Sequence, residues 1–261
     1  MKVRFTTLGC KLNFAESSAL GKELLSRGHQ RALQNEVPDV CVVNTCSVTD
    51  AADHKDRQAI NQLHRKYPNA IIVVTGCYAQ LQPEQIAQMD GVDFVLGQNE
   101  KYDIPALVDT LEAQLPHNAT PPLHTSTPLL HTSTPPLNHA IRVSAIREVD
   151  EFHGVHSGDD RTRCFIKVQD GCNYFCTYCT IPYARGKSRN PLISEVVADA
   201  QEALLQGAKE LILTGVNIGD FGRSTGETFI DLLRALDNLS SLASSPRRLT
   251  ASVFLLASQT Y

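Results

Sequence analysis

Three cysteines, Cys172, Cys176 and Cys179, follow one another in the spacing Cys-x-x-x-Cys-x-x-Cys. Thiolates are the soft ligands that iron–sulfur clusters select. Three thiolates on one short loop can hold three irons of a cubane and leave the fourth iron open, as a reactive metal site requires. A zinc knuckle without its fourth ligand, or a cluster of disulfide-forming thiols, would give the same spacing. We favour an iron–sulfur cluster with one open coordination position.

A second set of cysteines, Cys10, Cys46 and Cys77, is spread over the first part of the chain. Each follows a predicted strand by one or two residues, and ligands bind where the carboxyl ends of parallel strands gather. A lone cysteine after a strand is usually a small buried hydrophobe, but three at equivalent positions favour a second cluster. Cys41 and Cys164 stand at the starts of predicted strands, so we interpret them as core residues.

The elements that must position the second set alternate between strand and helix. Short β-branched runs predict strands at residues 3–8, 40–44, 70–75 and 93–96. Asn13 and Glu16 suit the capped start of a helix that ends at Gly28. Further helices are predicted after Asp50 and over 104–115, the latter behind a cap at Asn99. This alternation predicts a doubly wound parallel sheet covered on both faces.

Residues 116–140 differ from the rest in being a low-complexity Ser/Thr/Pro segment, which predicts an extended linker. The chain is therefore divided into domains at 1–115 and 141–261, with the linker between them. In the second domain, strands are predicted at 164–168 and 210–214, and helices from Pro191 to Gly207 and over 229–239. Two consecutive β–α units are the start of a (β/α) barrel. With only two units, one face of this sheet is expected to stay uncovered and prone to aggregation.

The bulk composition is that of an ordinary globular protein of 261 residues, with 42% apolar and 20% charged residues. No apolar run is long enough to cross a bilayer, and the N-terminus lacks the apolar region of a secretory leader. Eight cysteines in such a chain predict a cytoplasmic protein. The net charge of −4 gives no overall argument for nucleic-acid binding. Residues 163–189 are nevertheless basic: they hold five Lys and Arg side chains against Asp170 alone.

Around both sets of cysteines the sequence resembles the radical S-adenosylmethionine (SAM) methylthiotransferases. The resemblance is carried by the loop 171–179, with the aromatic Tyr178 before its last cysteine, and by three segments of the first domain. These read Gly-Cys-Lys-Leu-Asn at 9–13, Asn-Thr-Cys-Ser-Val-Thr at 44–49 and Thr-Gly-Cys-Tyr-Ala-Gln at 75–80. The resemblance covers nearly the whole chain apart from the linker and about the last fifteen residues.

The resemblance implies two [4Fe-4S] clusters and SAM as cofactors. Cys10, Cys46 and Cys77 would bind an auxiliary cluster that handles sulfur, and the loop cysteines would bind the cluster whose open iron chelates SAM. Cleavage of SAM would give a 5′-deoxyadenosyl radical that removes hydrogen from C2 of an adenine before a methylthio group is added. The implied partners are tRNA, an electron donor such as flavodoxin or ferredoxin, and a sulfur donor, with no role for a membrane.

Four further residues are implied to lie beside the cofactor. Tyr178 would pack beside the SAM adenine or, as a loop aromatic, shield the cluster. Thr214, Gly215 and Asn217 follow the second strand of the barrel, where glycine lets the backbone approach a ligand closely. An ordinary turn would explain the same glycine-rich pattern. No individual catalytic residue is predicted.

Three cations after the cysteine loop, Arg185, Lys187 and Arg189, are interpreted as a contact for tRNA phosphate or for the SAM carboxylate. A solvated charged face is the competing interpretation.

Segments 44–53 and 214–222 are most similar to the subfamily that modifies N6-threonylcarbamoyladenosine in the tRNA anticodon loop. The branches that act on isopentenyladenosine or on a ribosomal protein carry different residues in the second segment. Family members continue beyond residue 261, and residues 249–261 do not resemble their continuation, so a C-terminally truncated chain is expected. An inactive fragment that binds iron–sulfur clusters and a zinc-binding scaffold are the alternative functions.

Overall fold

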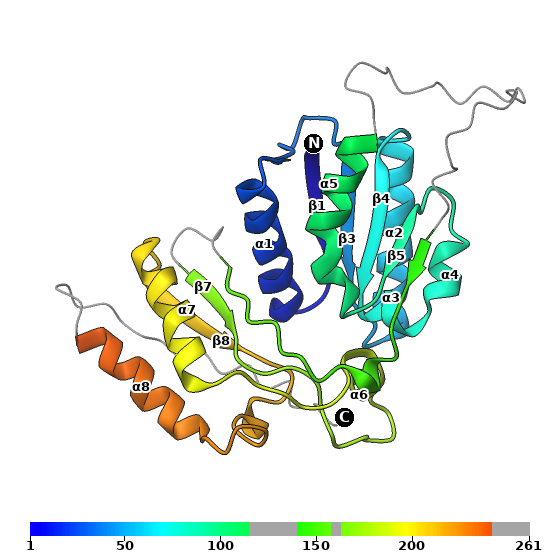
Figure 1. Cartoon of the computed structure of the whole chain (residues 1–261). Coiled ribbons are helices and arrows are strands. Elements are labelled where there is room, and N and C mark those ends of the chain that lie inside the picture. The colour runs from blue at the N-terminus through cyan, green and yellow to red at the C-terminus, as the bar shows by residue number, and fades with distance from the viewer. Residues whose placement is uncertain (115–139, 158–162, 242–261) are drawn as a thin grey trace, which may run out of the picture.

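The computed structural model describes residues 1–114, 140–157 and 163–241 of the chain (Figure 1). Its first part is a parallel sheet in the order β2-β1-β3-β4-β5-β6. The strands are β1 (Lys2–Thr7), β2 (Gln30–Arg31), β3 (Val40–Thr45), β4 (Ile71–Gly76), β5 (Phe94–Leu96) and β6 (Ala140–Arg142). The predicted α/β class and parallel sheet are therefore confirmed.

Helices cover both faces of this sheet. Helices α1 (Lys11–Ser26) and α5 (Ile104–Gln114) lie on one face, and α2 (Asp50–Lys66), α3 (Cys77–Leu81) and α4 (Pro83–Ala87) lie on the other (Figure 1). Strand β3 is buried along its whole length, because its side chains alternate between the two helical layers. Cys41 is fully buried in one of these layers, as expected for a core residue.

The start of α1 differs from the prediction. The helix begins at Lys11 with Cys10 at the N-cap position, so Asn13 and Glu16 lie inside it and are buried. Their side chains do not cap the helix because both reach across to other elements. A short 3-10 helix (Glu100–Asp103) precedes α5, and Asn99 makes no side-chain cap. Gly28 follows α1 with a φ of +93°, in agreement with its predicted position after the helix.

Strand β6 corrects the predicted domain boundary. Ala140–Arg142 pairs in parallel with β5, so these residues belong to the first sheet rather than to a linker or to the second domain. The pairing was not predictable because three residues after a low-complexity segment carry no strand signal of their own. The remainder of the predicted linker lies outside the described residues.

The second part contains the expected pair of parallel strands, β7 (Arg163–Lys167) and β8 (Glu210–Thr214). Helices α7 (Ile193–Leu205) and α8 (Phe229–Ser241) cover one face of this pair. Helix α7 begins later than predicted from Pro191, because Leu192 takes the cap position and its backbone N–H donates to Glu195 at 2.7 Å. The short helix α6 (Ile181–Arg185) follows the cysteine loop, and a 3-10 turn (Ile218–Asp220) follows β8. Another 3-10 turn (Ile146–Glu148) lies in the segment between the two sheets.

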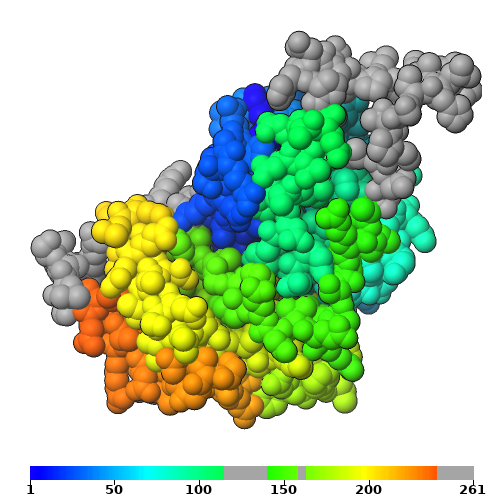
Figure 2. Space-filling view, in the orientation of Figure 1, coloured from blue at the N-terminus to red at the C-terminus, as the bar shows by residue number. Residues whose placement is uncertain are grey.

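The other face of the β7–β8 pair is covered by helix α1 of the first sheet, which corrects the expectation of an uncovered face. Phe165 and Ile212 pack there against Ala15, and the ring of Phe14 meets Phe165 edge to face at 5.6 Å. Figure 2 shows α1 and α7 side by side at this junction, where Lys22 donates to Gln206 at 2.8 Å. Helix α1 is thus a shared layer between the two sheets, and the two parts of the molecule are packed directly together.

Among the helices of the described ranges, none is both long and apolar enough to cross a membrane.

Candidate functional site

The first set of cysteines lies at the carboxyl edge of the six-stranded sheet. The strand order reverses between β1 and β3, since the chain runs outward from β1 to β2 and then returns to continue with β3 on the other side. Such a switch point opens a crevice beyond the strand ends. Cys10 follows β1 and Cys46 follows β3, so the two thiols flank this point, and Cys77 stands at the end of the next strand, β4.

Gly9 and Asn13 bring the first two cysteine loops together. Gly9 has a φ of +93°, and a Cβ placed on it would come within 2.6 Å of the Cys46 Sγ. Asn13 Nδ2 donates to the carbonyl oxygens of both Leu8 and Thr45 at 2.9 Å. One side chain of α1 therefore ties the ends of β1 and β3 to each other beside Cys10.

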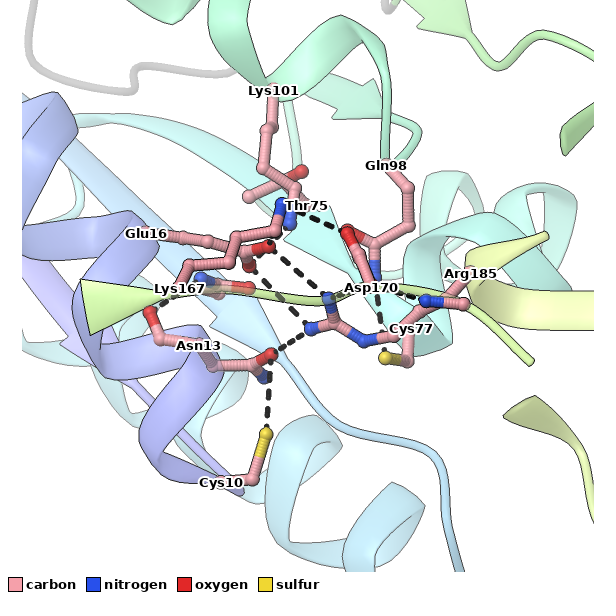
Figure 3. Close-up of polar contacts among 12 residues, drawn as sticks. Cys10, Asn13, Glu16, Thr75, Cys77, Gln98, Lys101, Lys167, Asp170 and Arg185 are labelled. Atoms are coloured by element: carbon pink, nitrogen blue, oxygen red, sulfur yellow. Dashed lines mark hydrogen bonds and ion pairs between the residues drawn. The ribbon is translucent and has the colours of Figure 1, made fainter. Parts of the chain in front are cut away.

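Cys77 is placed by Gly76, which turns the chain from β4 into α3 with a φ of +100°. The Sγ of Cys77 accepts a hydrogen bond from Gln98 Nε2 at 3.2 Å. Gln98 follows β5, so a fourth strand end contributes a donor to the same edge (Figure 3). Nothing in the local sequence singles out Gln98, because its role depends only on the neighbouring strand.

Substitution of Gly76 by alanine is expected to lower the free energy of unfolding by about 4 kcal/mol or more, the range that marks a specific structural defect. A Cβ at this position would lie 2.6 Å from the backbone nitrogen of Thr45, which cannot move without disturbing β3. Gly28→Ala is the matched control, since Gly28 has φ +93° but no atom within 4 Å and should show only the intrinsic cost of roughly 1–2 kcal/mol. Urea unfolding of the two variants measures the difference. Equal losses would contradict the steric argument.

The three thiols of the first set influence one another electrostatically. Burial raises the pKa of the Cys46 thiol to about 12, and the adjacent Cys77 and Cys10 add to the shift. Burial also raises the pKa of Cys77, while Arg185 and Lys101 act in the opposite direction. Three buried or half-buried thiols that repel one another as thiolates are costly without a bound cation or cluster.

The second set of cysteines lies on the loop that leaves β7. Gly171 starts this loop with a φ of +70°, and a Cβ there would be 2.7 Å from the carbonyl oxygen of Gly186. Cys172 N–H donates to the same carbonyl at 3.0 Å, and Cys179 N–H donates to the Cys176 carbonyl at 2.9 Å. Burial raises the pKa of Cys172, to which Cys179, Asp220 and Cys176 contribute. Cys176 is exposed and the other two are half-buried, so the loop presents its thiols toward the surface.

Gln169 joins the cysteine loop to the glycine-containing loop after β8. Its Nε2 donates to the Gly171 carbonyl at 2.7 Å, and its Oε1 accepts from the backbone N–H of Asn217 at 2.7 Å. Gly215 is also beside Gln169, because a Cβ on it would be 3.0 Å from the Gln169 Cβ. Gly215 and Asn217 are thus brought next to the cysteine loop.

Thr214 and Tyr178 lie at opposite extremes of exposure. The hydroxyl of Thr214 is buried in the sheet and donates to the Ile166 carbonyl at 3.1 Å. The hydroxyl is thus committed to the neighbouring strand, and the predicted position of Thr214 beside the cofactor stays a prediction. Tyr178 is 70% exposed, and its predicted position beside the SAM adenine stays a prediction.

The loops that carry the two sets of cysteines are in direct contact. Thr180, the residue after Cys179, donates through its hydroxyl to the carbonyl of Ser47, the residue after Cys46, at 2.9 Å. Helix α6, which ends at Arg185, packs against α3, which begins at Cys77. The structure therefore brings together two cysteine loops that are more than a hundred residues apart in the chain.

Arg185 is 1% exposed, which corrects its assignment as a contact for tRNA phosphate. Its guanidinium donates to Glu16 at 3.1 Å, to Asp170 at 3.0 Å and to the Oδ1 of Asn13 at 2.5 Å (Figure 3). Arg189 donates to the backbone carbonyl of Arg185 at 2.7 Å and to Asp170 at 3.3 Å, so it too is largely engaged within the protein. Both cations are held inward by ion pairs to buried carboxylates.

Lys187 alone of the three predicted cations has a predominantly exposed side chain, at 58%. Its exposed partner Asp150 lies at 3.2 Å, and exposed pairs of this kind are easily exchanged for another anion.

The residues of both sets fit thiolate-bound clusters. Within the described part of the chain, no three His, Cys, Asp or Glu side chains are grouped so that they could hold a single metal ion. A cubane does not require such a group, because each thiolate binds a different iron. The donor chemistry is suitable: soft thiols, a side-chain N–H directed at one sulfur, and a buried cation close to Cys77. Metal binding by these six cysteines stays a prediction.

Comparison with known families divides the chain in the same way. The family described as "Uncharacterized protein family UPF0004" matches residues 2–97, and the radical SAM superfamily matches residues 166–251. The matched ranges contain the first and the second set of cysteines, respectively.

Curated relatives match most of the chain. Threonylcarbamoyladenosine tRNA methylthiotransferase MtaB is 36% identical in Bacillus subtilis, over 90% of this chain and 48% of the relative. The MtaB of Aquifex aeolicus is 35% identical, over 93% and 54%. Ribosomal protein uS12 methylthiotransferase RimO of Chloroflexus aurantiacus is 33% identical, over 87% and 48%. The chain thus spans about half the length of the curated relatives that it matches.

Among solved structures, the radical SAM methyltransferase TsrM from Kitasatospora setae, determined with cobalamin and a [4Fe-4S] cluster, superposes with a TM-score of 0.56. The identity is 14%, and the match covers 95% of this chain and 53% of that protein. At this identity the likeness concerns the fold alone.

Proposed function

We propose that the chain belongs to the radical SAM methylthiotransferases and is the cluster-binding part of a tRNA-modifying enzyme, on the basis of the two matched families and the MtaB relatives. The proposed reaction adds a methylthio group to C2 of N6-threonylcarbamoyladenosine in the tRNA anticodon loop. When bound, SAM and two [4Fe-4S] clusters would supply the radical and the sulfur that this reaction needs.

The observation that carries the proposal is the direct contact between the two cysteine loops. The hydrogen bond from Thr180 to Ser47 holds the residues that follow Cys179 and Cys46 within 2.9 Å of each other. A reaction that generates a radical at one centre and transfers sulfur from another needs both centres beside one substrate atom. A protein that only stored two clusters would have no need for this proximity.

Each part of the site has a role in this proposal. Cys172, Cys176 and Cys179 would hold the SAM-binding cluster, and the first set would hold the auxiliary cluster. Gln98 would donate to the sulfur of Cys77 and so stabilise its thiolate form. The loop after β8, with Gly215 and Asn217, would line the SAM side of the site, since Gln169 holds it against the cysteine loop.

We infer the substrate and the partners from the relatives. The MtaB relatives modify threonylcarbamoyladenosine in tRNA by name, and we extend this substrate to the present chain. Lys187 is the side chain that we propose for contact with an RNA phosphate, because it is exposed and pairs only at the surface. An electron donor such as a flavodoxin or ferredoxin, and a sulfur donor, complete the set of partners. The proposed setting is the cytoplasm, where thiols stay reduced.

Anaerobic reconstitution with iron and sulfide, followed by incubation with SAM and a reductant, tests the proposal. We expect about eight irons per chain, from two four-iron clusters, and formation of 5′-deoxyadenosine that depends on the reductant. Adding tRNA that contains N6-threonylcarbamoyladenosine should then yield its methylthio derivative, detected by mass spectrometry of the digested nucleosides.

Other outcomes distinguish the alternatives. About eight irons without 5′-deoxyadenosine would indicate an inactive iron–sulfur fragment, and stoichiometric zinc without a coloured cluster would indicate a zinc scaffold. Modification of ribosomal protein S12 in place of tRNA would assign the chain to the branch of its RimO relatives.

A further inference from the structure

A buried network of charged side chains lies beside Cys10 and Cys77 (Figure 3) and reaches the start of the second cysteine loop. The reaction proposed above assigns the network no role. Its carboxylates are Glu16 on α1 and Asp170 at the start of the cysteine loop. Its cations, each in an ion pair with one or both carboxylates, are Lys101, Lys167, Arg185 and Arg189. Distances run from 2.6 Å for Lys101–Glu16 to 3.4 Å for Lys167–Glu16.

Within the described ranges this network joins four cations to two carboxylates, and all but Arg189 have side chains at most 4% exposed. An excess of buried positive charge is unfavourable unless an anion lies nearby. Glu16 shows how strong the field is: burial favours its neutral form, yet Arg185, Lys101 and Lys167 together hold its pKa well below the usual range. Burial, Arg185 and Lys167 lower the pKa of Lys101, against the effect of Glu16. Even without Lys101, the three other cations outnumber the two carboxylates.

Two members of the network, Arg185 and Lys101, act on Cys77, and Arg185 also binds the side chain beside Cys10. Burial opposes its charge, but Glu16, Cys77, Asp170 and Cys10 together raise its pKa well above the ordinary value. The hydrogen bonds of Arg185 also place it beside Cys10. The guanidinium donates to Asn13 Oδ1 at 2.5 Å, and the thiol of Cys10 lies 3.8 Å from that same oxygen.

The same guanidinium also reaches the second set. It donates to Asp170 at 3.0 Å, and Asp170 accepts the backbone N–H of Gly171, the residue before Cys172, at 2.9 Å. One buried cation thus connects the loop of Cys10 with the start of the loop of Cys172.

We propose that Arg185 is a positioning residue that fixes the two cysteine loops relative to each other and supplies the buried countercharge that sets the reduction potential of the auxiliary cluster. The inference rests on the proposed function, since it requires that Cys10, Cys46 and Cys77 hold a cluster. Net charge around a cluster is a main determinant of its potential. A reduced cluster carries one more negative charge than an oxidised one, so the cation favours reduction. Glu16 has the opposite effect.

The test uses the full chain with Cys172, Cys176 and Cys179 replaced by alanine, so that only the auxiliary site remains. After anaerobic reconstitution, the midpoint potential is measured by redox titration followed by electron paramagnetic resonance. Arg185→Gln should shift the potential to more negative values, and Glu16→Gln to more positive values. The double variant should return close to the parent, because it removes one charge of each sign.

Two further variants separate charge from structure. Arg185→Lys keeps the charge and should keep a parent-like potential. If Arg185→Gln does not fold, the test uses Arg185→Lys and Glu16→Gln: a changed potential in the lysine variant, or an unchanged one in Glu16→Gln, would contradict the inference. Arg234→Gln removes a positive charge at a position with 74% exposure on α8 and should leave the potential unchanged.

The outcomes are distinguishable. If the parent with only the first set binds no iron, the proposed function itself fails at this site. If it binds about four irons but Arg185→Gln and Glu16→Gln leave the potential unchanged or move it in the same direction, the inference on Arg185 is wrong while the cluster assignment stands. Opposite shifts with a compensated double variant support it, since a merely structural role would not reverse sign.

Discussion

Replacing Cys172, Cys176 and Cys179 together by alanine is expected to abolish formation of 5′-deoxyadenosine from SAM and to lower the bound iron from about eight to about four per chain. The reason is that this loop is the proposed holder of the cluster with an open iron, and no other described thiol lies on it. The measurement is iron content together with chromatographic detection of 5′-deoxyadenosine after anaerobic reduction.

The complementary variant replaces Cys10, Cys46 and Cys77. It should lose the same amount of iron but retain cleavage of SAM, because the second loop is tied to β8 and α6 through its own contacts. Methylthio transfer should be lost in both variants. If SAM cleavage were lost on replacing the first set and kept on replacing the second set, the roles assigned to the two clusters would be exchanged.

Cys41→Ala and Cys164→Ala are matched controls for these experiments. Both cysteines are buried in core clusters, on β3 and β7, and neither belongs to a proposed site. Their loss should reduce stability slightly through lost packing and leave the iron content unchanged. A drop in iron for either control would show that iron content reports folding rather than ligation.

Glu16→Gln is expected to destabilise the cluster-free protein by about 3–5 kcal/mol, the usual cost of breaking a buried ion pair on one side. Glu16 is 1% exposed and forms ion pairs with three cations at 2.6–3.4 Å, which hold α1 against β7 and α6 of the second part. Loss of its charge leaves Lys101 buried without the carboxylate at 2.6 Å. Urea unfolding under reducing conditions gives the difference in free energy.

The destabilisation caused by Glu16→Gln should be smaller at acidic pH than at neutral pH. Since the folded protein holds the pKa of Glu16 below its usual value, the carboxylate contributes stability above the unfolded pKa of about 4.3. This contribution is lost as the pH falls below that value toward the folded pKa. The stability difference between the parent and Glu16→Gln should therefore narrow in acid. Glu23→Gln, on the exposed side of the same helix and paired with Arg27, is the control and should change little at any pH. A constant difference across pH would contradict the ionic origin of the effect.

The positions of both sets of cysteines could be predicted from the sequence, because they depend on patterns a few residues long. A strand followed by a turn and a cysteine recurs at Cys10, Cys46 and Cys77, and parallel strands collect such positions at one edge. The spacing of the second loop requires no tertiary information at all. The structure agrees with both arguments by placing the first set around the switch point and the second on a single loop.

The residues that connect the two sites could not be predicted from the sequence in this way. Asn13 and Glu16 look like a helix cap in the sequence, and Arg185 looks like part of a basic surface. In the folded chain Arg185 donates hydrogen bonds to Glu16 and Asn13, which are 169 and 172 residues away in the sequence, in the buried interface between the two parts. No local periodicity marks a pairing that depends on how two sheets dock against one helix.

The sequence alone thus determined the parallel α/β class, the two groups of thiols and the family that they indicate, because repeating patterns and short motifs act over a few residues. Tertiary structure alone decided that α1 lies between both sheets, that β6 belongs to the first of them, and that Arg185 points inward to Glu16. The physical reason is that burial of apolar faces and pairing of buried charges are settled only when distant segments come into contact.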